Sequence, residues 1–514
     1  MIIRNREAGT HPLCLDINRY KTIKQYIMTI EEIFSKEQAK DIIAELKNGR
    51  EVPAPDVDAA KKALNPDLHD VNNPLIRKDK RVKVDVDEDS GDKVIEVSGG
   101  ESTSMRIEKV ARIRLAIQKL IIRRAVSFLF GNNVAYNSDA ESEQEKAVMK
   151  AFNRILRDVK IGTIDRQVGR TIFGFKECAE IWFPVEVAGG ASSRYGFASK
   201  YKLRCAVLSP EKGNALYPYF DETGDMIAFS RSYSRKDSSG KSIDYFETYT
   251  NSQQFLWWNA GGNGYEIVEG YPKMLSIPKI PIVYGRQDKF ETEDVDSLVD
   301  RLEVLLSNFA DTNDYHAAPK IFIKGELKGF SRKGESGAII EGEDDADAKY
   351  LSWQNAPESV KLEIETILRL IYTLTQTPDI SFDSVKGLGA ISGIALKLLF
   401  MDAHLKVQDK REVFDDYLQR RANIIKAYIG VFNKSLSAVC EEMDIEPEIT
   451  PYMLTSEIDE LNYWMTANGN KPVLSQEESV EKVGVSKNPK ETYEKLKEEE
   501  RRSNSFVIGE PVDA

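Results

Sequence analysis

The stretch SFDSVKGLGAISGIALK, residues 381–397, lies between two of the longest and most regular helical patterns in the chain. It is nearly uncharged, its side chains are mostly small, and it holds the three glycines Gly387, Gly389 and Gly393. Glycine reaches backbone conformations that are closed to other residues, and it adds no side-chain bulk. The sequence therefore predicts a short flexible loop between two helices, with little of its own to pack.

Apolar residues repeat at helical spacing on both sides of this loop. Before it, PESVKLEIETILRLIYTLTQ predicts a helix that ends at Pro378. After it, a helix can run from Ser392 to about Ile429, roughly 55–60 Å at 1.5 Å per residue. Another helix is predicted over 292–315, and a short β-like segment over 318–354 separates it from the first. Two such helices joined by a compact β tip would form a hairpin.

The first part of the chain predicts short helices and a hairpin. Residues 1–27 are expected to form a loose arm, and residues 28–70 are helical with a break at VPAPD, 52–56. Residues 80–100 alternate apolar and charged side chains, which indicates a hairpin that turns at 89–91. Two longer helices are predicted over 104–131 and about 141–160.

Regular turn signals indicate β structure over about 172–285. The turns fall at Thr223-Gly224, at 238–240 and at 260–264, so the sequence predicts an antiparallel meander. The stretch SIPKIPIVYG, 276–285, is expected to be an extended connector or an edge strand, because proline cannot donate to a sheet ladder.

Three shorter helices are predicted after residue 434. One begins at Thr455 or Ser456, and the next carries the capping box Ser475-Gln-Glu-Glu478. The last, NPKETYEKLKEEERR, is almost wholly polar, and residues 504–514 are expected to form a disordered tail.

Length and composition describe an ordinary globular protein. A chain of 514 residues is too long for one core and predicts roughly three or four domains. Hydrophobic content of 41% and charged content of 30% are typical of soluble proteins, and no stretch approaches the roughly 20 apolar residues of a membrane span. The four cysteines have no framework spacing. A net charge of −12 argues by itself against tight nucleic-acid binding, which needs a basic surface.

Motifs for catalysis are missing from the sequence. The chain has neither the G-x-x-x-x-G-K-[ST] phosphate loop nor the G-x-S-x-G nucleophile elbow. Gly387 and Gly389 follow a helix and lack the further glycine of a dinucleotide site. The histidines are isolated from one another, so a zinc site has no support. We therefore expect no catalytic residue, no metal site and no cofactor.

One acidic stretch is similar to a calcium-binding loop. Asp85, Asp87, Asp89 and Glu96 occupy positions 1, 3, 5 and 12 of an EF-hand. The turn glycine, Gly91, falls at position 7 instead of 6, and the flanking residues alternate as strands do. The preferred interpretation is the solvated tip of an acidic hairpin, and a cation site is the alternative.

The β-like segment divides its charges between two halves. Its first half is basic, and its second half is acidic from Glu341 to Asp347. This pattern suits a subunit contact or a docking surface for another protein, although plain surface loops would also carry it. The basic residues are Lys320, Lys324, Lys328, Arg332 and Lys333.

From Pro278 to Gly430 the chain resembles the portal (head–tail connector) proteins of tailed bacteriophages, in the family typical of long-tailed siphophages. The resemblance rests on TQTPDISF, GLGAISGIALK and DAHLK in this order, together with IPKIPIVYG, SNFADTNDYHAAPK and LQRRANIIKAYIG. It is weaker over 67–285, and it is faint in the first 60 residues and after 434.

The resemblance implies an α+β portal fold and a cyclic homo-oligomer, normally of twelve subunits, around a channel for double-stranded DNA at one capsid vertex. It also implies a name for each part of the chain. The parts are an N-terminal arm with helices (1–66), a wing of helices and an antiparallel meander (67–290), stem helix 1 (291–317), a small β clip (318–355), stem helix 2 (356–377), a tunnel loop (378–392), a long spine helix (393–433), a helical crown (434–503) and a disordered tail (504–514).

By this resemblance the glycine-rich loop projects into the channel. Its glycines would let many copies approach the duplex and adjust as it slides, and Lys386 is the cation expected to reach phosphate. Leu388 and Ile391 would make apolar contacts that ignore base sequence, or would pack on the neighbouring loop. A negative channel wall would repel phosphates and avoid tight binding, which agrees with the net charge. The predicted loop site comprises Ser381, Asp383, Lys386, Gly387, Leu388, Gly389, Ala390, Ile391 and Gly393.

The resemblance also implies partners. They are the large terminase subunit and the head-completion or adaptor proteins at the clip, the major capsid and scaffolding proteins, and the DNA itself, with no membrane. The protein would be assembled in the host bacterial cytoplasm, would reside at the portal vertex of the virion and would serve genome packaging and ejection. Two alternatives stay open: a protein-binding capsid or tail scaffold component that conducts no DNA, and an enzyme acting on nucleic acid, which the missing motifs disfavour.

Overall fold

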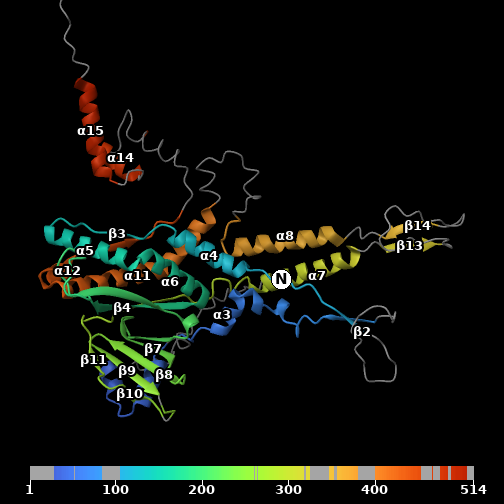
Figure 1. Ribbon diagram of the computed structural model, residues 1–514, viewed down its shortest axis with the longest axis horizontal. Coiled ribbons are helices and arrows are strands. Elements are labelled where there is room, and N and C mark those ends of the chain that lie inside the picture. Colours follow the sequence, from blue (N-terminus) through green and yellow to red (C-terminus); the bar gives the residue numbers. More distant parts are fainter. Residues whose placement is uncertain are drawn as a thin grey trace, which may run out of the picture.

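The computed structural model describes residues 28–50, 52–83, 105–259, 261–262, 264–317, 320–324, 347–351, 356–379, 400–452, 466, 475–483 and 488–505. Within these ranges the chain mixes helices with antiparallel strands, which confirms the predicted combination of helix and sheet. The described elements form a body of helices and sheets from which an elongated arm extends (Figure 1).

The arm consists of two long helices and a strand pair. Helices α7 (Asp296–Ala317) and α8 (Ala356–Leu374) lie side by side, and β13 (Lys320–Lys324) pairs with β14 (Asp347–Leu351) beyond them (Figure 1). This confirms the predicted order of helix, β segment and helix. At the base of the arm, both helices share an apolar cluster with α4 (Ile117–Phe130). The buried members of that cluster are Ile117, Ile121, Val295, Val299, Leu302, Leu305, Ile367 and Ile371.

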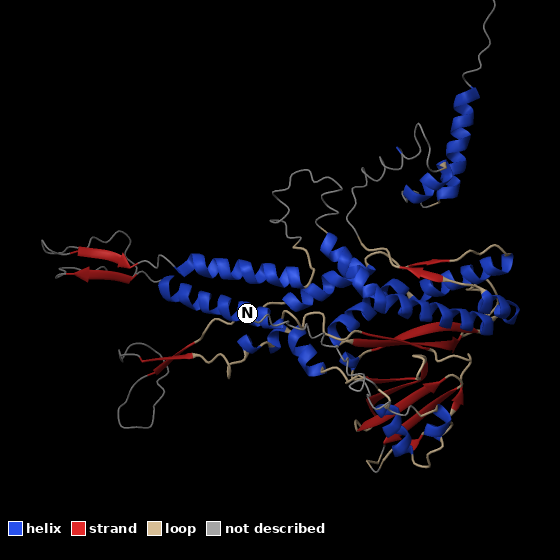
Figure 2. Ribbon diagram, turned by 180° about the vertical axis from the view of Figure 1, so that it is seen from behind, coloured by secondary structure: helices blue, strands red, loops and turns tan. Residues whose placement is uncertain are grey.

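Helices cover one face of a three-stranded sheet in the body (Figure 2). The helices that contact it are α5 (Glu143–Val159), α6 (Ile161–Phe175) and α11 (Met401–Phe432). The strand order is β12-β4-β5, with β4 at Glu177–Glu186, β5 at Tyr201–Leu208 and β12 at Ile282–Arg286. The edge position of β12 confirms the expectation for SIPKIPIVYG. The core between helices and sheet is fully buried and includes Phe152, Ile172, Trp182, Phe414 and Ile425.

A second sheet of the body is the predicted meander. Its strands follow one another in chain order from β6 to β10, all antiparallel, and β11 pairs with β9. The predicted turns at 223–224, 238–240 and 260–264 lie between consecutive strands, so the hairpins are confirmed. The strands are β6 (Ala215–Phe220), β7 (Met226–Lys236), β8 (Ser242–Thr250), β9 (Gln253–Asn259), β10 (Glu266–Ile267) and β11 (Lys273–Met274).

The predicted helix over 104–131 is wrong in its first half. Helix α4 begins only at Ile117, and Met105–Glu108 form the strand β2 instead. Strand β2 pairs with β1 (Lys80–Lys83), so the hairpin predicted to turn at 89–91 has a later second strand than expected. Residues 84–104, with the calcium-like positions, lie outside the described residues.

Helix α6 was not predicted, because its sequence indicated strands from about residue 172. Its glycines Gly162, Gly169 and Gly174 lower helix propensity. One of them has a packing role, since a Cβ on Gly169 would lie 3.2 Å from ring carbons of Phe130 in α4. The glycine therefore allows α4 and α6 to approach closely, and tertiary packing outweighs local preference.

Short helices flank these parts at both ends of the described chain. The N-terminal helices are α1 (Ile30–Phe34), α2 (Ala39–Asn48) and α3 (Val57–Leu64), and the predicted break at VPAPD is confirmed. Helices α1 and α2 pack on the meander sheet through an apolar cluster with Phe246 and Trp257. Near the base of α3 lies the one-turn helix η2 (Pro66–Leu68).

After α11 come α12 (Ser437–Glu442) and β15 (Glu446–Glu448), which pairs with β3 (Ala135–Asn137). Helices α14 (Gln476–Val483) and α15 (Pro489–Ser505) follow. The predicted capping box is confirmed, because the Glu478 N–H donates to Ser475 Oγ at 3.2 Å and the Ser475 N–H donates to Glu478 Oε2 at 2.9 Å.

Two predictions for the C-terminal part lie outside the described residues: the helix start at Thr455 or Ser456, and the tail beyond residue 505. Within the ranges given above, no helix is both long and apolar enough to cross a membrane.

Candidate functional site at the base of the arm

The residues predicted for the tunnel loop all lie between 381 and 393, outside the described residues. Of the predicted docking cations, Lys320 and Lys324 belong to β13, where they stand opposite Leu351 and Asp347 of β14. Lys328, Arg332 and Lys333 lie outside the described residues. The candidate site is therefore built from the arm and from the two ends of the glycine-rich segment, at residues 379 and 400.

The chain leaves α8 through a short turn that α4 holds in place. Gln376 adopts a left-handed conformation with φ of 49°, which is uncommon outside glycine. Arg124 of α4 donates a hydrogen bond to the carbonyl oxygen of Pro378 at 2.9 Å. Its guanidinium carbon also lies 5.7 Å from the ring centre of Tyr372 in α8, a cation–π distance. The position of the chain at residue 378 is therefore set by α4.

The chain returns from the segment against the same helix. Phe400 is only 2% exposed, and its ring centre lies 5.5 Å from that of Phe128 in α4. Arg124 and Phe128 are four residues apart, so they lie on one face of α4. One turn of helix therefore fixes both ends of the glycine-rich segment.

A buried ion group joins α11 to the bases of both arm helices. Lys406 Nζ lies 2.6 Å from Glu291 Oε1 and donates to the carbonyl oxygen of Thr375 at 2.7 Å. Lys410 Nζ lies 2.9 Å from Glu291 Oε2. Burial lowers the pKa of Lys406, and the charge of Glu291 opposes that change. Because Glu291 precedes α7 and Thr375 follows α8, one ammonium group connects three helices at the base of the arm.

Helix α7 offers a row of acceptors to the chain that precedes α4. Glu303, Ser307 and Asp311 stand four residues apart, and alternate N–H groups of the neighbouring segment donate to them. The bonds are Leu115 N–H to Glu303 at 2.6 Å, Ile113 N–H to Ser307 at 2.8 Å and Ala111 N–H to Asp311 at 2.7 Å. Four helical residues rise about 6 Å and two extended residues about 6.6 Å, so the two repeats match. We call this arrangement the helix–chain ladder.

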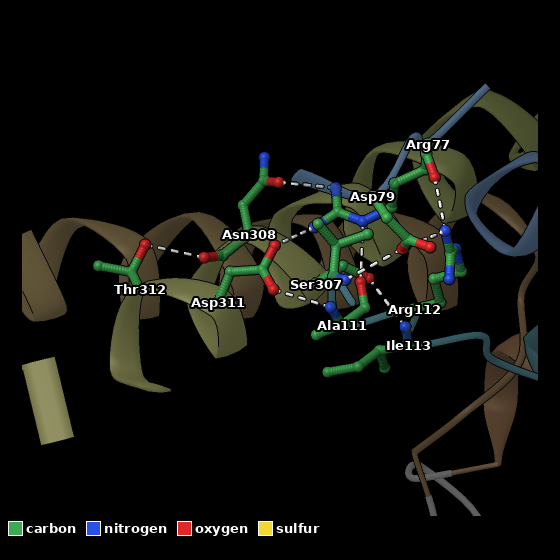
Figure 3. A network of polar contacts seen from close by, with 10 residues as sticks. Arg77, Asp79, Ala111, Arg112, Ile113, Ser307, Asn308, Asp311 and Thr312 are labelled. Atoms are coloured by element: carbon green, nitrogen blue, oxygen red, sulfur yellow. Dashed lines mark hydrogen bonds and ion pairs between the residues drawn. The ribbon is translucent and has the colours of Figure 1, made fainter. Parts of the chain in front are cut away.

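Charged groups stand at both ends of the ladder. Arg77 donates to Asp311 at 2.6 Å and to Asn308 at 2.8 Å, as Figure 3 shows. At the other end, His69 Nδ1 lies 2.7 Å from Glu303 Oε1, and both side chains are almost fully buried. Burial opposes protonation of His69, but the hydrogen bond and charge of Glu303 outweigh it and raise the pKa of the imidazole. The ladder thus fastens one side of the arm to its own subunit.

The other arm helix keeps a row of exposed leucines. Leu362, Leu370 and Leu374 are 65%, 41% and 57% exposed, and their spacing of four and eight residues places them on one row of α8. Arg301 of α7 bridges to Glu363 of α8 at 2.8 Å nearby, so the row lies beside a polar link between the two helices. Large apolar side chains in an exposed row are typical of a surface that another molecule covers.

Sequence reasoning did not select the residues that organise this site. Arg124, Glu291 and Lys406 look like ordinary surface charges in the sequence, because nothing local reveals their burial. The acceptor row was detectable in principle, as polar residues repeat at 303, 307 and 311 on the predicted apolar helix. In the part of the chain that the structure describes, no cluster of three or more His, Cys, Asp or Glu side chains could hold a metal ion.

Comparisons with known proteins identify a family that the chain matches. A family model described as phage portal protein, SPP1 Gp6-like, matches residues 102–505. No curated protein matches the chain. Similar solved chains come from the neck of an empty GTA particle computed with C6 symmetry (TM-score 0.37, 11% identity) and the neck of a native GTA particle computed with C12 symmetry (0.36, 12%). Another comes from the virion of a native gene transfer agent particle (0.33, 11%). These alignments cover 72% of this chain and 88–89% of those chains.

Proposed function

The chain belongs to the SPP1 Gp6-like family of phage portal proteins, and on that premise we propose that it forms a ring at one capsid vertex and conducts double-stranded DNA during packaging and ejection. The observation that carries the proposal is the family match over residues 102–505. Portal proteins are structural components of phage particles, and we propose no catalysis for this one.

The exposed row on α8 supports the ring. A subunit that leaves Leu362, Leu370 and Leu374 in water gains by burying them against a second copy. When the contact joins two different faces of the subunit, it repeats around an axis and closes if the rotation fits. We propose a ring of normally twelve subunits, with α7 and α8 as its paired stem helices.

The contacts of Arg124 and Phe128 in α4, which we call the bracket on α4, support the tunnel loop. Arg124 and Phe128 fix the chain on either side of the glycine-rich segment, so the segment starts and ends at one point of each subunit. In a ring, such points form a circle, from which the loops would project toward the duplex. We propose that residues 381–393 contact the DNA, with Lys386 as the cation that reaches phosphate.

The end of the arm is the proposed docking surface. Strands β13 and β14 lie beyond α7 and α8 (Figure 1), at the far end of the arm from the body. We propose that residues 318–355 dock the large terminase subunit and later the head-completion or adaptor proteins, and that capsid and scaffolding proteins contact the ring elsewhere. Assembly in the host bacterial cytoplasm and residence in the virion follow from this function.

The substitution Gly389→Trp tests DNA conduction. A bulky indole group in each of many loops would obstruct the bore, so we expect intact oligomeric rings but mostly empty heads. Electron microscopy would show the rings, and the DNA content of particles would show how far the heads are filled. Gly389→Ala is the matched control and should fill its heads. Normal DNA content in Gly389→Trp particles would contradict the tunnel assignment and favour the alternative, a scaffold component that conducts no DNA.

A further inference from the structure

A groove of about 610 Å³ opens between α3, α4 and α6, where the arm meets the body. Its apolar lining residues, which we call the floor, are Leu64, Leu68, Ile122 and Phe175. The neutral polar residues Asn65, Gln167 and Thr171 also line it. Leu68 is 53% exposed, although it is a large apolar residue. The ladder, the bracket on α4 and the exposed row on α8 do not use this groove.

The floor of the groove is fixed by close packing within the subunit. A Cβ on Gly174 of α6 would lie 3.0 Å from Leu64 Cδ1 and 3.7 Å from Ile122 Cδ1. Glycine at this position therefore lets α3 rest directly on α6 beside α4. Three packed helices therefore form the groove, and Leu68 is the exposed residue among the four of its floor.

The rim of the groove is strongly basic. Lys61 comes from α3, Lys119 and Arg123 from α4, and Arg170 from α6, and all four side chains are exposed. Among the described residues, none of the four forms an ion pair with a carboxylate, and Glu211 is the single acidic residue of the lining. These four cations make the groove locally positive, although the net charge of the whole chain is −12.

We propose that this groove binds an acidic amphipathic helix of a partner protein. An apolar floor with a cationic rim is the complement of a helix whose apolar stripe is flanked by Glu and Asp. Walls made of helices accept another helix by packing its side-chain ridges into their grooves. Nucleic-acid phosphates would use the rim but leave the apolar floor uncovered, whereas an amphipathic helix covers both. The proposal does not depend on DNA conduction by the ring.

The test uses the full chain and a labelled helix-forming peptide with leucines on one face and glutamates on the other. We expect saturable binding by fluorescence anisotropy. A matched peptide with glutamine in place of glutamate should bind about tenfold more weakly, because it forms none of the rim ion pairs. The triple variant Lys119→Glu, Arg123→Glu and Arg170→Glu should weaken binding of the acidic peptide at least as much.

The control variant carries Lys40→Glu, Lys150→Glu and Lys236→Glu, which are exposed lysines outside the groove with the same total change of charge. It should bind the acidic peptide within about twofold of the unchanged chain. Leu68→Ser, which changes no charge, should also weaken binding, because it removes apolar surface from the floor, and unchanged binding would contradict the proposed contact. Circular dichroism and ring formation, measured separately, show whether each variant folds and assembles.

Three outcomes would overturn the proposal. The first is equal weakening by the groove and control triple variants, which would mean general attraction of charge. The second is equal binding of the acidic and neutral peptides. The third is tighter binding of a duplex DNA probe that the groove variant abolishes, which would identify the rim as a nucleic-acid surface.

Discussion

The body and the arm hold their long helices in opposite ways. In the body, α11 is embedded in a closed core around the fully buried guanidinium of Arg421. In the arm, α7 is fastened along one side by the ladder, while α8 leaves Leu362, Leu370 and Leu374 exposed. The body therefore builds its core within one subunit, although it exposes some apolar side chains such as Met401 and Leu405 of α11. The arm differs in that its exposed leucines form one row, which none of the described residues covers.

The centre of the body gathers several elements around one charge. Arg421 donates to both carboxylate oxygens of Glu180 at 2.7 and 3.1 Å, and to Asp165 at 2.5 Å and the hydroxyl of Tyr136 at 3.2 Å. These groups lie on β4, α6 and β3. Burial raises the pKa of Asp165, and Arg421 only partly offsets the rise. Two buried carboxylates thus depend on one cation.

Arg421→Ala should have the largest effect on stability. It leaves two carboxylates in the core without their cation, and breaking a buried pair from one side costs about 3–5 kcal/mol. We expect the free energy of unfolding to fall by that amount in urea titrations. Arg411→Ala, on the same helix with a half-exposed partner in Asp415, should cost less than about 1 kcal/mol. Equal losses in the two variants would mean that the body does not depend on its buried centre.

Asp311→Ala should have a smaller and more local effect, because the ladder holds one side of the arm only. It removes the acceptor for the Ala111 N–H and for Arg77, so we expect a loss of about 1–3 kcal/mol. Hydrogen exchange should accelerate over residues 109–115 while the body keeps its protection. Thr312→Ala is the neighbouring control, since the Thr312 hydroxyl donates to the carbonyl oxygen of Asn308 within α7 and, among the described residues, makes no bond to the ladder (Figure 3). Unchanged exchange over 109–115 in Asp311→Ala would contradict the ladder.

The same two regions show what a sequence can predict. The arm helices were predictable because Val299, Leu302, Ile367 and Ile371 recur at helical spacing, and the core uses that face. The meander was predictable from turn glycines such as Gly224, whose φ of +88° suits glycine. Both signals are local in the sequence, and the packing of the folded chain agrees with them.

Other features depend on partners far away in the sequence. The segment before α4 looked helical, yet the Ala111 N–H pairs with Asp311, 200 residues later. Lys406 and Arg124 became parts of the candidate site only through burial, which a single sequence does not reveal. The loop residues from Ser381 to Gly393 came from the glycines and the family resemblance, and their role stays a prediction.

The ladder should also respond to pH through His69. Its pKa is raised by Glu303, so the stabilisation is complete below the unfolded value of about 6.5 and is lost as pH rises through the higher folded value. Each pKa unit by which the folded value exceeds the unfolded value corresponds to about 1.4 kcal/mol of stability. We expect His69→Gln to be more destabilising, relative to the unchanged chain, at about pH 6 than at about pH 8.5. A penalty that grows with pH would show that His69 is held neutral.

The exposed row on α8 should give the smallest effect on the subunit itself. The double variant Leu362→Glu and Leu374→Glu changes side chains that are 65% and 57% exposed, so the unfolding free energy of the monomer should change by about 0.5 kcal/mol or less. Ring formation, followed by native mass spectrometry, should nevertheless be lost, because charges would enter the contact with the next copy. Met274→Glu, on an apolar residue of the body that is 73% exposed, is the control and should still form rings. If the α8 variant assembled as well as the control, the exposed row on α8 would need a different partner, and the contrast between the body and the arm would no longer indicate a ring.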